Sequence, residues 1–230
     1  MKNIIAENRV RFQLLFFLPP FRYTCHMPVS FFRMSASGVP CDEAEAARYL
    51  GYAKNTSPDS AVSDLIHKAC AKMQERLAPQ AVFDVFPLVH GADNLLSFAG
   101  TELHSVDLSR NLLKCARVVL FAATIGPQVD ALIRRTQPGG KAEAAVMQAA
   151  GAMFIESFVD ALNDKIKADE ESAGYKTHPR YSPGYGDVPL SVQQLFFSHL
   201  PCSRIGLTLM DTLVMAPEKS VTAFIGIEQY

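Results

Sequence analysis

The sequence predicts an α+β fold, a mostly antiparallel sheet with flanking helices. Arg117–Thr124 (RVVLFAAT) is a continuous apolar run of strand length, typical of a strand covered on both faces. Residues 141–168 form the longest helical pattern, in which apolar side chains recur every four positions. The other strand candidates do not alternate strictly with helices, as they would in a doubly wound parallel sheet, and this order favours an antiparallel sheet.

Helices are predicted from apolar spacing and from signals at their ends. Residues 42–51 (DEAEAARYLG) carry acids in the first turn and end at a glycine, which is typical of a short helix. Ser57 and Pro58 predict the N-cap and first position of a second helix, whose apolar residues recur as far as Met73. Four further helical patterns follow, at residues 105–115, 127–135, 141–168 and 190–200.

The remaining strands are predicted from alternation and from the turns between them. Residues 81–88 (AVFDVFPL) alternate, and Leu95–Phe98 is predicted to pair with them in a hairpin across residues 91–94. Residues 174–187 are rich in Gly, Pro and Tyr and are predicted to form a loop. Two further strand candidates lie near the C-terminus, at residues 205–210 and 221–227.

A change of composition predicts a boundary at residue 34. Residues 1–34 hold five basic residues and one acid, whereas the rest of the chain holds 17 basic and 22 acidic residues. A secretory signal is one interpretation, but its apolar run LLFFL is only five residues long before the prolines at 19–20. The favoured interpretation is a disordered extension or a misassigned start, with an ordered domain beginning near Met27 or Met34. Residues 35–230 are then one domain.

The composition excludes several classes of protein. Hydrophobic residues make up 49% of the chain and charged residues 20%, which is typical of a globular protein. The net charge is −1, so there is no basic excess for nucleic-acid binding. No apolar run approaches the roughly 18 residues of a membrane span. The five cysteines are widely spaced without a CxxC pair, which favours reduced thiols and a cytoplasmic location.

The common catalytic motifs are absent from the sequence. There is no P-loop, no GxGxxG after a strand, no GxSxG and no HExxH. The six histidines are scattered without the spacing of metal ligands. The sequence therefore favours a binding module, or a subunit whose chemistry belongs to a bound cofactor.

One loop, RYSPGYGD at residues 180–187, has the composition of a ligand-binding loop. Gly184 and Gly186 allow the backbone to approach a ligand closely, and Arg180 presents a fork that suits a carboxylate. Tyr185 can cover a flat ring. A small zwitterionic ligand fits this set, while a plain turn with an aromatic contact is the alternative interpretation.

Glu156 is the second candidate for ligand binding. It directly follows the almost wholly apolar residues 144–155, and Asp160 lies one helical turn later on the same face. A carboxylate at the edge of a buried helix is unfavourable unless it meets a cation or a donor. The partner is either a ligand's positive group or a neighbouring arginine, and the sequence alone leaves both open.

Several motifs together resemble a known family. RYSPGY at residues 180–185 matches a family motif R-x-x-P-G-Y, and Glu156 falls where the family's long helix carries a ligand-binding acid. Downstream motifs follow in the family's order and spacing, at residues 209–212 (LMDT), 215–217 (MAP) and 220–221 (SV). Over about residues 117–227 the chain resembles the reactivation domain of vitamin B12-dependent methionine synthase, the module that binds S-adenosylmethionine. The resemblance implies the α+β fold of that domain.

The resemblance also implies a cofactor and partners. In that family, S-adenosylmethionine methylates cobalamin that has been oxidised to Co(II), with an electron from flavodoxin or ferredoxin. The homocysteine and folate barrels and the cobalamin-binding DxHxxG motif are absent from this chain. The resemblance therefore implies a freestanding reactivation subunit that acts on a separate corrinoid-binding methionine synthase subunit, with cobalamin supplied by that partner.

Residue by residue, the resemblance implies roles for the loop and the helix. Arg180 would pair with the methionine carboxylate, and Glu156 would meet the ammonium group. Ser182 and Gly184 would offer backbone hydrogen bonds, and Tyr185 would lie nearest the sulfonium methyl and the corrin. The cofactor-binding residues implied are Arg180, Ser182, Pro183, Gly184, Tyr185 and Glu156, with no catalytic residue and no metal ligand.

The sequence departs from the family at two places. GDVPL at residues 186–190 replaces a family segment with a cysteine and a His-Thr-Glu-Lys run, so contacts of that segment with cobalamin are not implied. The family acid six positions before the arginine falls on Gly174, which leaves Glu170 or Glu171 as substitutes only if the loop shifts. Two other functions remain open: an interaction subunit that has lost the ligand, and an independent S-adenosylmethionine-dependent methyltransferase.

Overall fold

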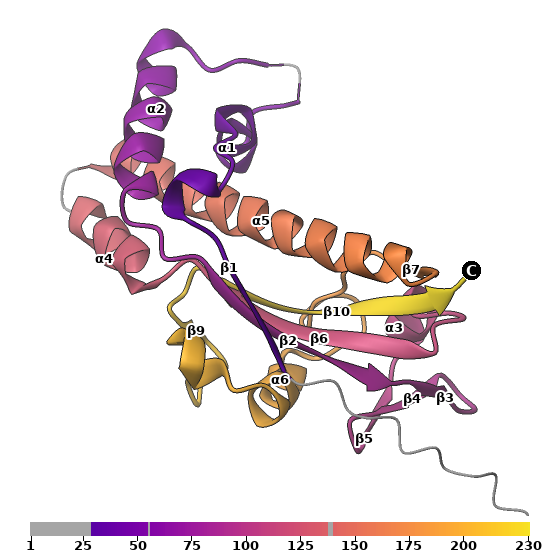
Figure 1. Ribbon diagram of the computed structural model, residues 1–230. Coiled ribbons are helices and arrows are strands. Elements are labelled where there is room, and N and C mark those ends of the chain that lie inside the picture. The colour runs from indigo at the N-terminus through magenta and orange to yellow at the C-terminus, as the bar shows by residue number, and fades with distance from the viewer. Residues whose placement is uncertain (1–28, 55, 138–139) are drawn as a thin grey trace, which may run out of the picture.

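The computed structural model describes residues 29–54, 56–137 and 140–230, and its centre is a five-stranded sheet. All neighbouring strands of this sheet are antiparallel, as predicted. The strands run in the order β1 (Ser30–Arg33), β2 (Gln80–Pro87), β6 (Arg117–Thr124), β10 (Ser220–Gln229) and β7 (Tyr175–Thr177). Helices and short strands cover both faces, which gives the α+β architecture seen in Figure 1.

Strand β6 lies at the middle of the sheet and divides the core in two. Val119, Phe121 and Ala123 face one apolar cluster, while the residues between them face the other. All of them are fully buried, because a strand covered on both faces has no polar side. The prediction made from the apolar run at Arg117–Thr124 is confirmed.

One face of the sheet is covered by the long helix α5 (Lys141–Ser172), which lies over the sheet in Figure 1. Phe154, Phe158 and Leu162 lie on the buried stripe of this helix and pack on the sheet. Three shorter helices pack beside it: α1 (Glu43–Tyr49), α2 (Ser60–Gln74) and α4 (Pro127–Thr136). By length and composition alone α5 could cross a membrane, but 61% of its most apolar stretch is buried inside the fold, as in the core helix of a soluble protein.

The opposite face carries shorter elements. Helix α6 (Gln193–His199) packs on it through Phe196, whose ring lies 4.7 Å from that of Phe224 on β10. The other elements of this face are α3 (Val106–Asn111), the 3₁₀ turns η3 (Leu190–Val192) and η4 (Cys202–Ile205), the strands β3 (Val89–His90), β4 (Leu95–Phe98) and β5 (Thr101–His104), and the pair β8 (Thr208–Leu209) and β9 (Met215–Ala216). A further 3₁₀ turn, η1 (Ala36–Gly38), follows β1.

Three local predictions are corrected. Strand β2 pairs with β1 and β6 and not with β4, which instead forms a small sheet with β3 and β5. Helix α2 begins at Ser60, because the Asp59 side chain accepts a hydrogen bond from the Val62 N–H and so acts as the N-cap in place of Ser57. Residues 205–210 form the end of η4 and the two-residue strand β8 rather than one long strand.

The structure describes the end of the segment that was predicted to be an extension, and its first strand agrees with an ordered domain that begins near Met27. Ser30–Arg33 form β1, which pairs with β2 from Ser30 to Arg33, and the ring of Phe32 stacks on that of Phe158 with centroids 5.7 Å apart. Apolar burial against α5 and backbone pairing therefore place these four residues inside the domain. The rest of the predicted extension, residues 1–28, lies outside the described residues.

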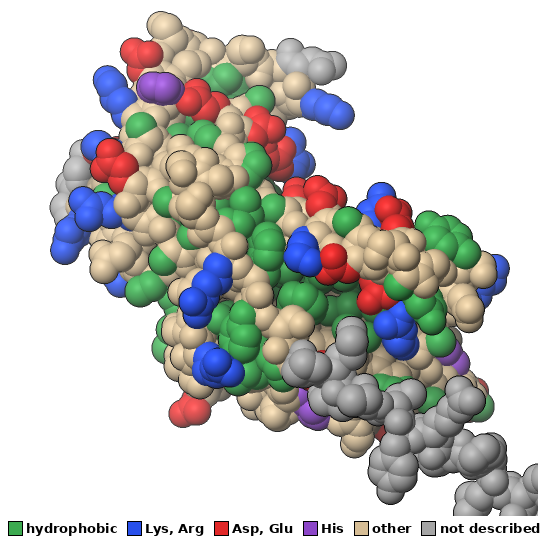
Figure 2. Space-filling view, in the orientation of Figure 1, with side chains coloured by type: hydrophobic (Ala, Val, Ile, Leu, Met, Phe, Trp, Pro, Cys, Tyr) green, Lys and Arg blue, Asp and Glu red, His purple; other side chains and the backbone are tan. Residues whose placement is uncertain are grey.

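Charged side chains of both signs are interspersed over the face shown in Figure 2. No single basic stripe gathers on that face, which agrees with the net charge of −1. The four cysteines of the described residues, Cys41, Cys70, Cys115 and Cys202, are free thiols.

Candidate functional site

A cleft of about 460 Å³ lies where β10, helix α5 and the loop 180–187 come together. Strand β7 pairs with β10 only from Ile227 onward, and Tyr181 forms a single bridge to Phe224. In the part of the chain that the structure describes, residues 220–222 therefore have a free edge on this side. The cleft is lined by Glu156, Arg180, Tyr181, Ser182, Pro183, Tyr185, Gln193, Met215, Ser220, Val221 and Thr222.

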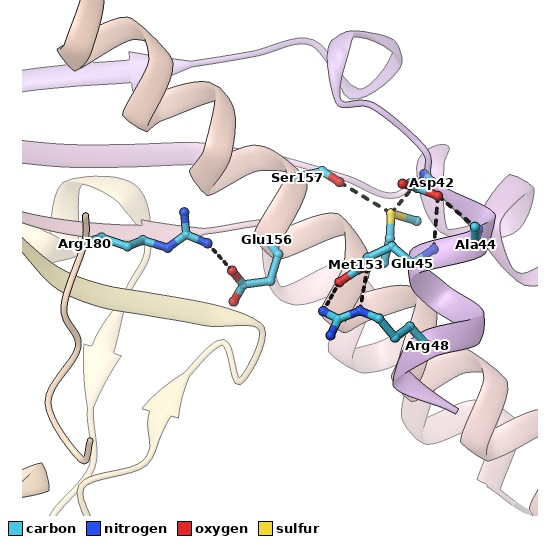
Figure 3. A network of polar contacts seen from close by, with 8 residues as sticks. All are labelled: Asp42, Ala44, Glu45, Arg48, Met153, Glu156, Ser157 and Arg180. Atoms are coloured by element: carbon cyan, nitrogen blue, oxygen red, sulfur yellow. Dashed lines mark hydrogen bonds and ion pairs between the residues drawn. The ribbon is translucent and has the colours of Figure 1, made fainter. Parts of the chain in front are cut away.

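The charged end of the cleft is an ion pair between the loop and α5. Arg180 Nη2 lies 2.6 Å from Glu156 Oε2, and Arg180 Nη1 lies 2.6 Å from Asp160 Oδ1. Figure 3 shows the side chains of Arg180 and Glu156 pointing toward one another from the loop and the helix. Of the two interpretations left open for Glu156, the neighbouring arginine is thus the partner in this ligand-free structure.

The environment of Arg180 favours its charged form. Burial of the guanidinium acts to lower the pKa of Arg180, but the hydrogen bond to Asp160 and the charge of Glu156 outweigh it and raise the pKa. The side chain of Glu156 is 34% exposed and that of Asp160 is 65% exposed. Arg180 is therefore a permanent cation at this end of the cleft, and a zwitterion can exchange partners with the ion pair that Arg180 forms with Glu156.

The loop follows a path that favours glycine at two positions. Gly184 and Gly186 have φ angles of +91° and +53°. A Cβ at Gly186 would clash with the Asp107 carboxylate and the Tyr181 hydroxyl. The Tyr181 hydroxyl in turn donates a hydrogen bond of 3.1 Å to the Tyr185 carbonyl, which closes the turn from inside.

Asp187 fixes the far end of the loop to the start of α3. Its carboxylate accepts hydrogen bonds from the Val106 N–H at 2.6 Å, from the Asp107 N–H at 3.3 Å and from the Ser105 hydroxyl. The hydrogen bond from Ser105 is the main reason that the pKa of Asp187 is held below its usual range. Ser105 also caps α3, since its Oγ accepts from the Leu108 N–H at 3.0 Å.

The structure brings five of the six predicted cofactor-binding residues to this cleft. Arg180 and Glu156 form its charged end, and Tyr185 lies at its rim with 70% of its surface exposed. Ser182 and Pro183 line the wall beside them. Gly184 is the exception, because its N–H donates to the Val188 carbonyl at 2.9 Å, so the predicted hydrogen bond from this residue to a ligand is directed within the loop instead.

Several lining residues were not predicted to bind a ligand. Met215, Ser220 and Val221 belong to the downstream motifs that carried the family resemblance, so the sequence marked their positions without giving them a role. Gln193 and Thr222 had no signal at all, because their place depends on how α6 and β10 meet.

The substitutes considered for the missing family acid do not reach the cleft. Glu170 Oε2 lies 2.7 Å from Arg117 Nη2 near the far end of α5, and Glu171 lies 3.9 Å from Lys167. Neither residue lines the cleft. The family has an acid six positions before the arginine. Neither Gly174 nor these two glutamates takes the place of that acid in the cleft.

A second contact network holds α1 against α5 beside Glu156 (Figure 3). Met153 Sδ accepts hydrogen bonds from the Asp42 N–H at 3.4 Å and from the Ser157 hydroxyl at 3.6 Å. The Asp42 carboxylate caps α1 through the N–H groups of Ala44 and Glu45, at 3.0 Å each. These contacts fix the segment of α5 that presents Glu156 to the cleft.

Within the described residues no group of three or more His, Cys, Asp or Glu side chains is arranged to hold a metal ion. Comparison with models of known protein families finds no match, and comparison with curated protein sequences finds none either.

A solved structure described as the MetH reactivation domain bound to AdoHcy does match. The TM-score is 0.65 at 16% sequence identity, over 88% of this chain and 79% of that one. At this identity the likeness establishes the fold. This chain has the α+β fold of the methionine synthase reactivation domain, as the sequence motifs predicted.

Proposed function

We propose that this protein is a freestanding reactivation subunit for a cobalamin-dependent methionine synthase or a related corrinoid protein. In this role it binds S-adenosylmethionine and presents it to cob(II)alamin held by the partner. An electron donor such as flavodoxin or ferredoxin completes the system. We expect a cytoplasmic location, because the widely spaced cysteines of the sequence favour reduced thiols.

The observation that carries the proposal is the pair of opposite charges at one end of the cleft. Arg180 and Glu156 are complementary to the carboxylate and the ammonium of an amino acid. They lie in a domain with the fold of a protein whose structure holds AdoHcy. Both residues also stand at the positions to which the sequence motifs assign these contacts.

The residues of the cleft fit S-adenosylmethionine in size and polarity. A volume of about 460 Å³ lies within the range of small-molecule sites. Met215 and Val221 provide apolar surface, and Tyr185 provides an exposed ring at the rim. An aromatic ring beside a sulfonium cation contributes about 1 kcal/mol of attraction.

The chain's own task is positioning rather than proton transfer. When bound, S-adenosylmethionine supplies the methyl group for transfer to cobalt. Arg180 and Glu156 hold the amino-acid end, the loop keeps Tyr185 at the mouth, and the partner's corrin approaches from the open side. Fixing two reactants in this way accelerates their reaction without an acid or base from the protein.

Isothermal titration calorimetry of the full chain with S-adenosylmethionine and S-adenosylhomocysteine tests the proposal. We expect both to bind, and we expect free cobalamin to give no spectral shift, since the corrinoid-ligating histidine motif is absent. A titration without heat would overturn the proposal. It would favour the alternative of an interaction subunit in which Arg180 and Glu156 serve only to join the loop to α5.

A coupled assay separates reactivation from independent methyl transfer. A cob(II)alamin-loaded corrinoid protein is mixed with reduced flavodoxin, S-adenosylmethionine and this chain. We expect the spectrum of methylcobalamin to develop only when all four components are present. Transfer of the methyl group of S-adenosylmethionine to an added small-molecule acceptor, without the corrinoid protein, would identify an independent methyltransferase instead.

A further inference from the structure

The cleft has a charged half and a neutral half, and the neutral half contains two polar side chains that each have an oxygen without a hydrogen-bond partner. Gln193 is 7% exposed and Thr222 is 2% exposed, and both line the cleft. Gln193 Oε1 and Thr222 Oγ1 are buried and accept or donate no hydrogen bond within the described residues. Arg180 and Glu156 supply all the formal charge of the lining. The neutral half therefore has no cation that could bind a phosphate group of a ligand.

Buried polar oxygens without a partner are rare, because each has lost its hydrogen bonds to water without replacement. An ordered water or a bound ligand supplies the missing bond in such cases, and a ligand can do so only where the residue lines a cleft, as Gln193 and Thr222 do. Two such oxygens on residues that line one cleft, from elements as distant in sequence as α6 and β10, are a stronger indication than either alone.

The backbone of β10 adds a polar edge at the same place. Phe224 exchanges both of its backbone hydrogen bonds with Tyr181, at 2.8 and 2.9 Å, so its N–H and C=O point to the free edge of the sheet. Hydrogen-bonding direction repeats every second residue along a strand, and Thr222 therefore turns its N–H and C=O to this same edge. The Thr222 side chain faces α6, on the same side of the sheet as Phe224.

We infer that Gln193 and Thr222 bind the nucleoside of the ligand, an inference that rests on the proposed function. Gln193 Oε1 is an acceptor and requires an N–H or O–H donor, while the Thr222 hydroxyl can donate or accept. With the amino-acid end held by Arg180 and Glu156, the donors left on the ligand are the ribose hydroxyls and the adenine amino group. The two residues thus select an adenosyl sulfonium over a simple alkyl one.

Two variants that preserve shape test this inference, Thr222→Val and Gln193→Met. Affinity for S-adenosylhomocysteine is measured by calorimetry, and the melting temperature is measured without ligand. We expect each variant to bind roughly two- to ten-fold more weakly, as for the loss of one hydrogen bond. We expect an unchanged or higher melting temperature, because removing an unpartnered buried oxygen relieves an unfavourable burial. A residue with only a structural role would give the opposite pair of results.

Asn163→Leu is the matched control. Asn163 lies on α5 and also has a buried oxygen without a partner, but it does not line the cleft. This variant is expected to leave affinity unchanged. A loss of affinity equal to that of Thr222→Val would show that the effect is not specific to the cleft and would overturn the inference.

Ligand analogues identify the group that each residue contacts. The titrations are repeated with S-inosylhomocysteine, which lacks the adenine amino group, and with the 2′-deoxy and 3′-deoxy forms of S-adenosylhomocysteine. The loss caused by a variant should vanish for the analogue that lacks its partner group. Equal losses with all three analogues, or unchanged affinity in both variants, would overturn the inference. If the parent protein binds no S-adenosylhomocysteine, the proposed function itself fails, and that result is distinct.

Discussion

Arg180 and Glu156 neutralise each other at one end of the cleft, with Nη2 and Oε2 2.6 Å apart. The sequence motifs assign these two side chains to opposite charges of one ligand. Binding of a zwitterion therefore exchanges one ion pair for two, and the guanidinium keeps Asp160 as its second partner. The ligand-free pair holds both side chains near their binding positions, which lowers the entropy lost on binding.

Arg180→Ala is expected to weaken S-adenosylhomocysteine binding by about 2–4 kcal/mol, because the ligand carboxylate loses its partner in a partly closed site. Arg180→Lys keeps the charge but not the planar fork, and is expected to fall between the parent and the alanine variant. Calorimetry gives both affinities. Melting temperatures should change little, since a partly exposed ion pair contributes little stability. Unchanged affinity in Arg180→Ala would refute the ligand-binding role that the family resemblance implies for this residue.

Glu156→Gln should weaken binding only for ligands with an ammonium group. A ligand such as 5′-methylthioadenosine lacks the amino acid, so its affinity should be equal in parent and variant. Asp160→Asn is the matched control, because Asp160 also holds Arg180 but does not line the cleft. Competition titrations give the affinity of the parent and of both variants for each ligand. A similar loss with both ligands in Glu156→Gln would assign this residue to the fold instead.

Gly186→Ala is expected to destabilise the protein and to weaken ligand binding. The left-handed backbone costs about 1–2 kcal/mol for a residue with a Cβ, and the clash with Asp107 and Tyr181 adds to it. Gly174→Ala is the control, since Gly174 has φ +83° but an added Cβ there has no neighbour within 4 Å. Urea denaturation should show a larger loss for Gly186→Ala, and only this variant should bind the ligand more weakly. Equal losses in both would show that the clash is relieved without cost.

Asp187→Asn should alter the pH dependence of stability. The pKa of Asp187 is lowered in the folded protein from its ordinary value of 3.8, so its ionised form stabilises the fold above that pH and the contribution is lost as the pH falls through the folded pKa. The stability difference between parent and variant should therefore shrink from pH 5 to pH 2. Denaturation at each pH measures this difference. A stability difference between parent and Asp187→Asn that does not vary with pH would contradict the lowered pKa of Asp187.

Ser105→Ala removes the side-chain cap of α3. This variant should cost about 1 kcal/mol of stability.

Phe32→Ala tests whether the domain begins before residue 34. Loss of the partly buried ring that stacks on Phe158 is expected to cost about 2 kcal/mol. A chain that begins at residue 35 should be less stable than one that begins at residue 29, because it lacks all of β1. Thermal denaturation of these variants decides the point. Equal stability of the two truncated chains would show that β1 contributes nothing.

The sequence predicted those elements whose pattern is continuous. Arg117–Thr124 is apolar at almost every position and became the central strand, and the four-residue spacing along α5 placed its buried face. Pairing was less predictable, because hydrogen bonds between β2 and β6 join segments that are distant in sequence. The hairpin predicted between β2 and β4 relied on alternation and on the turn residues 91–94, but β4 pairs with β3 and β5.

The candidate site was predictable where one segment carries several residues. The loop 180–187 and Glu156 were found because their residue types are unusual in their own neighbourhoods. Gln193 and Thr222 are ordinary residues in ordinary segments, and only the contact between α6 and β10 brings them to the cleft. The ion pair of Arg180 with Glu156 was one of two open interpretations, since a sequence does not record which charges meet.

In the charged half of the cleft, Glu156 lies on a 32-residue helix, whereas Arg180 lies on a loop that the Tyr181 bridge joins to the sheet. This division makes the response to ligand unequal across the molecule. Amide hydrogens of α5 near Glu156 are already protected by the helix, so their exchange rates should scarcely change on binding. Slower exchange should be confined to the loop and to the free edge of β10. Ligand binding would then order the loop side of the site and leave the helix side unchanged.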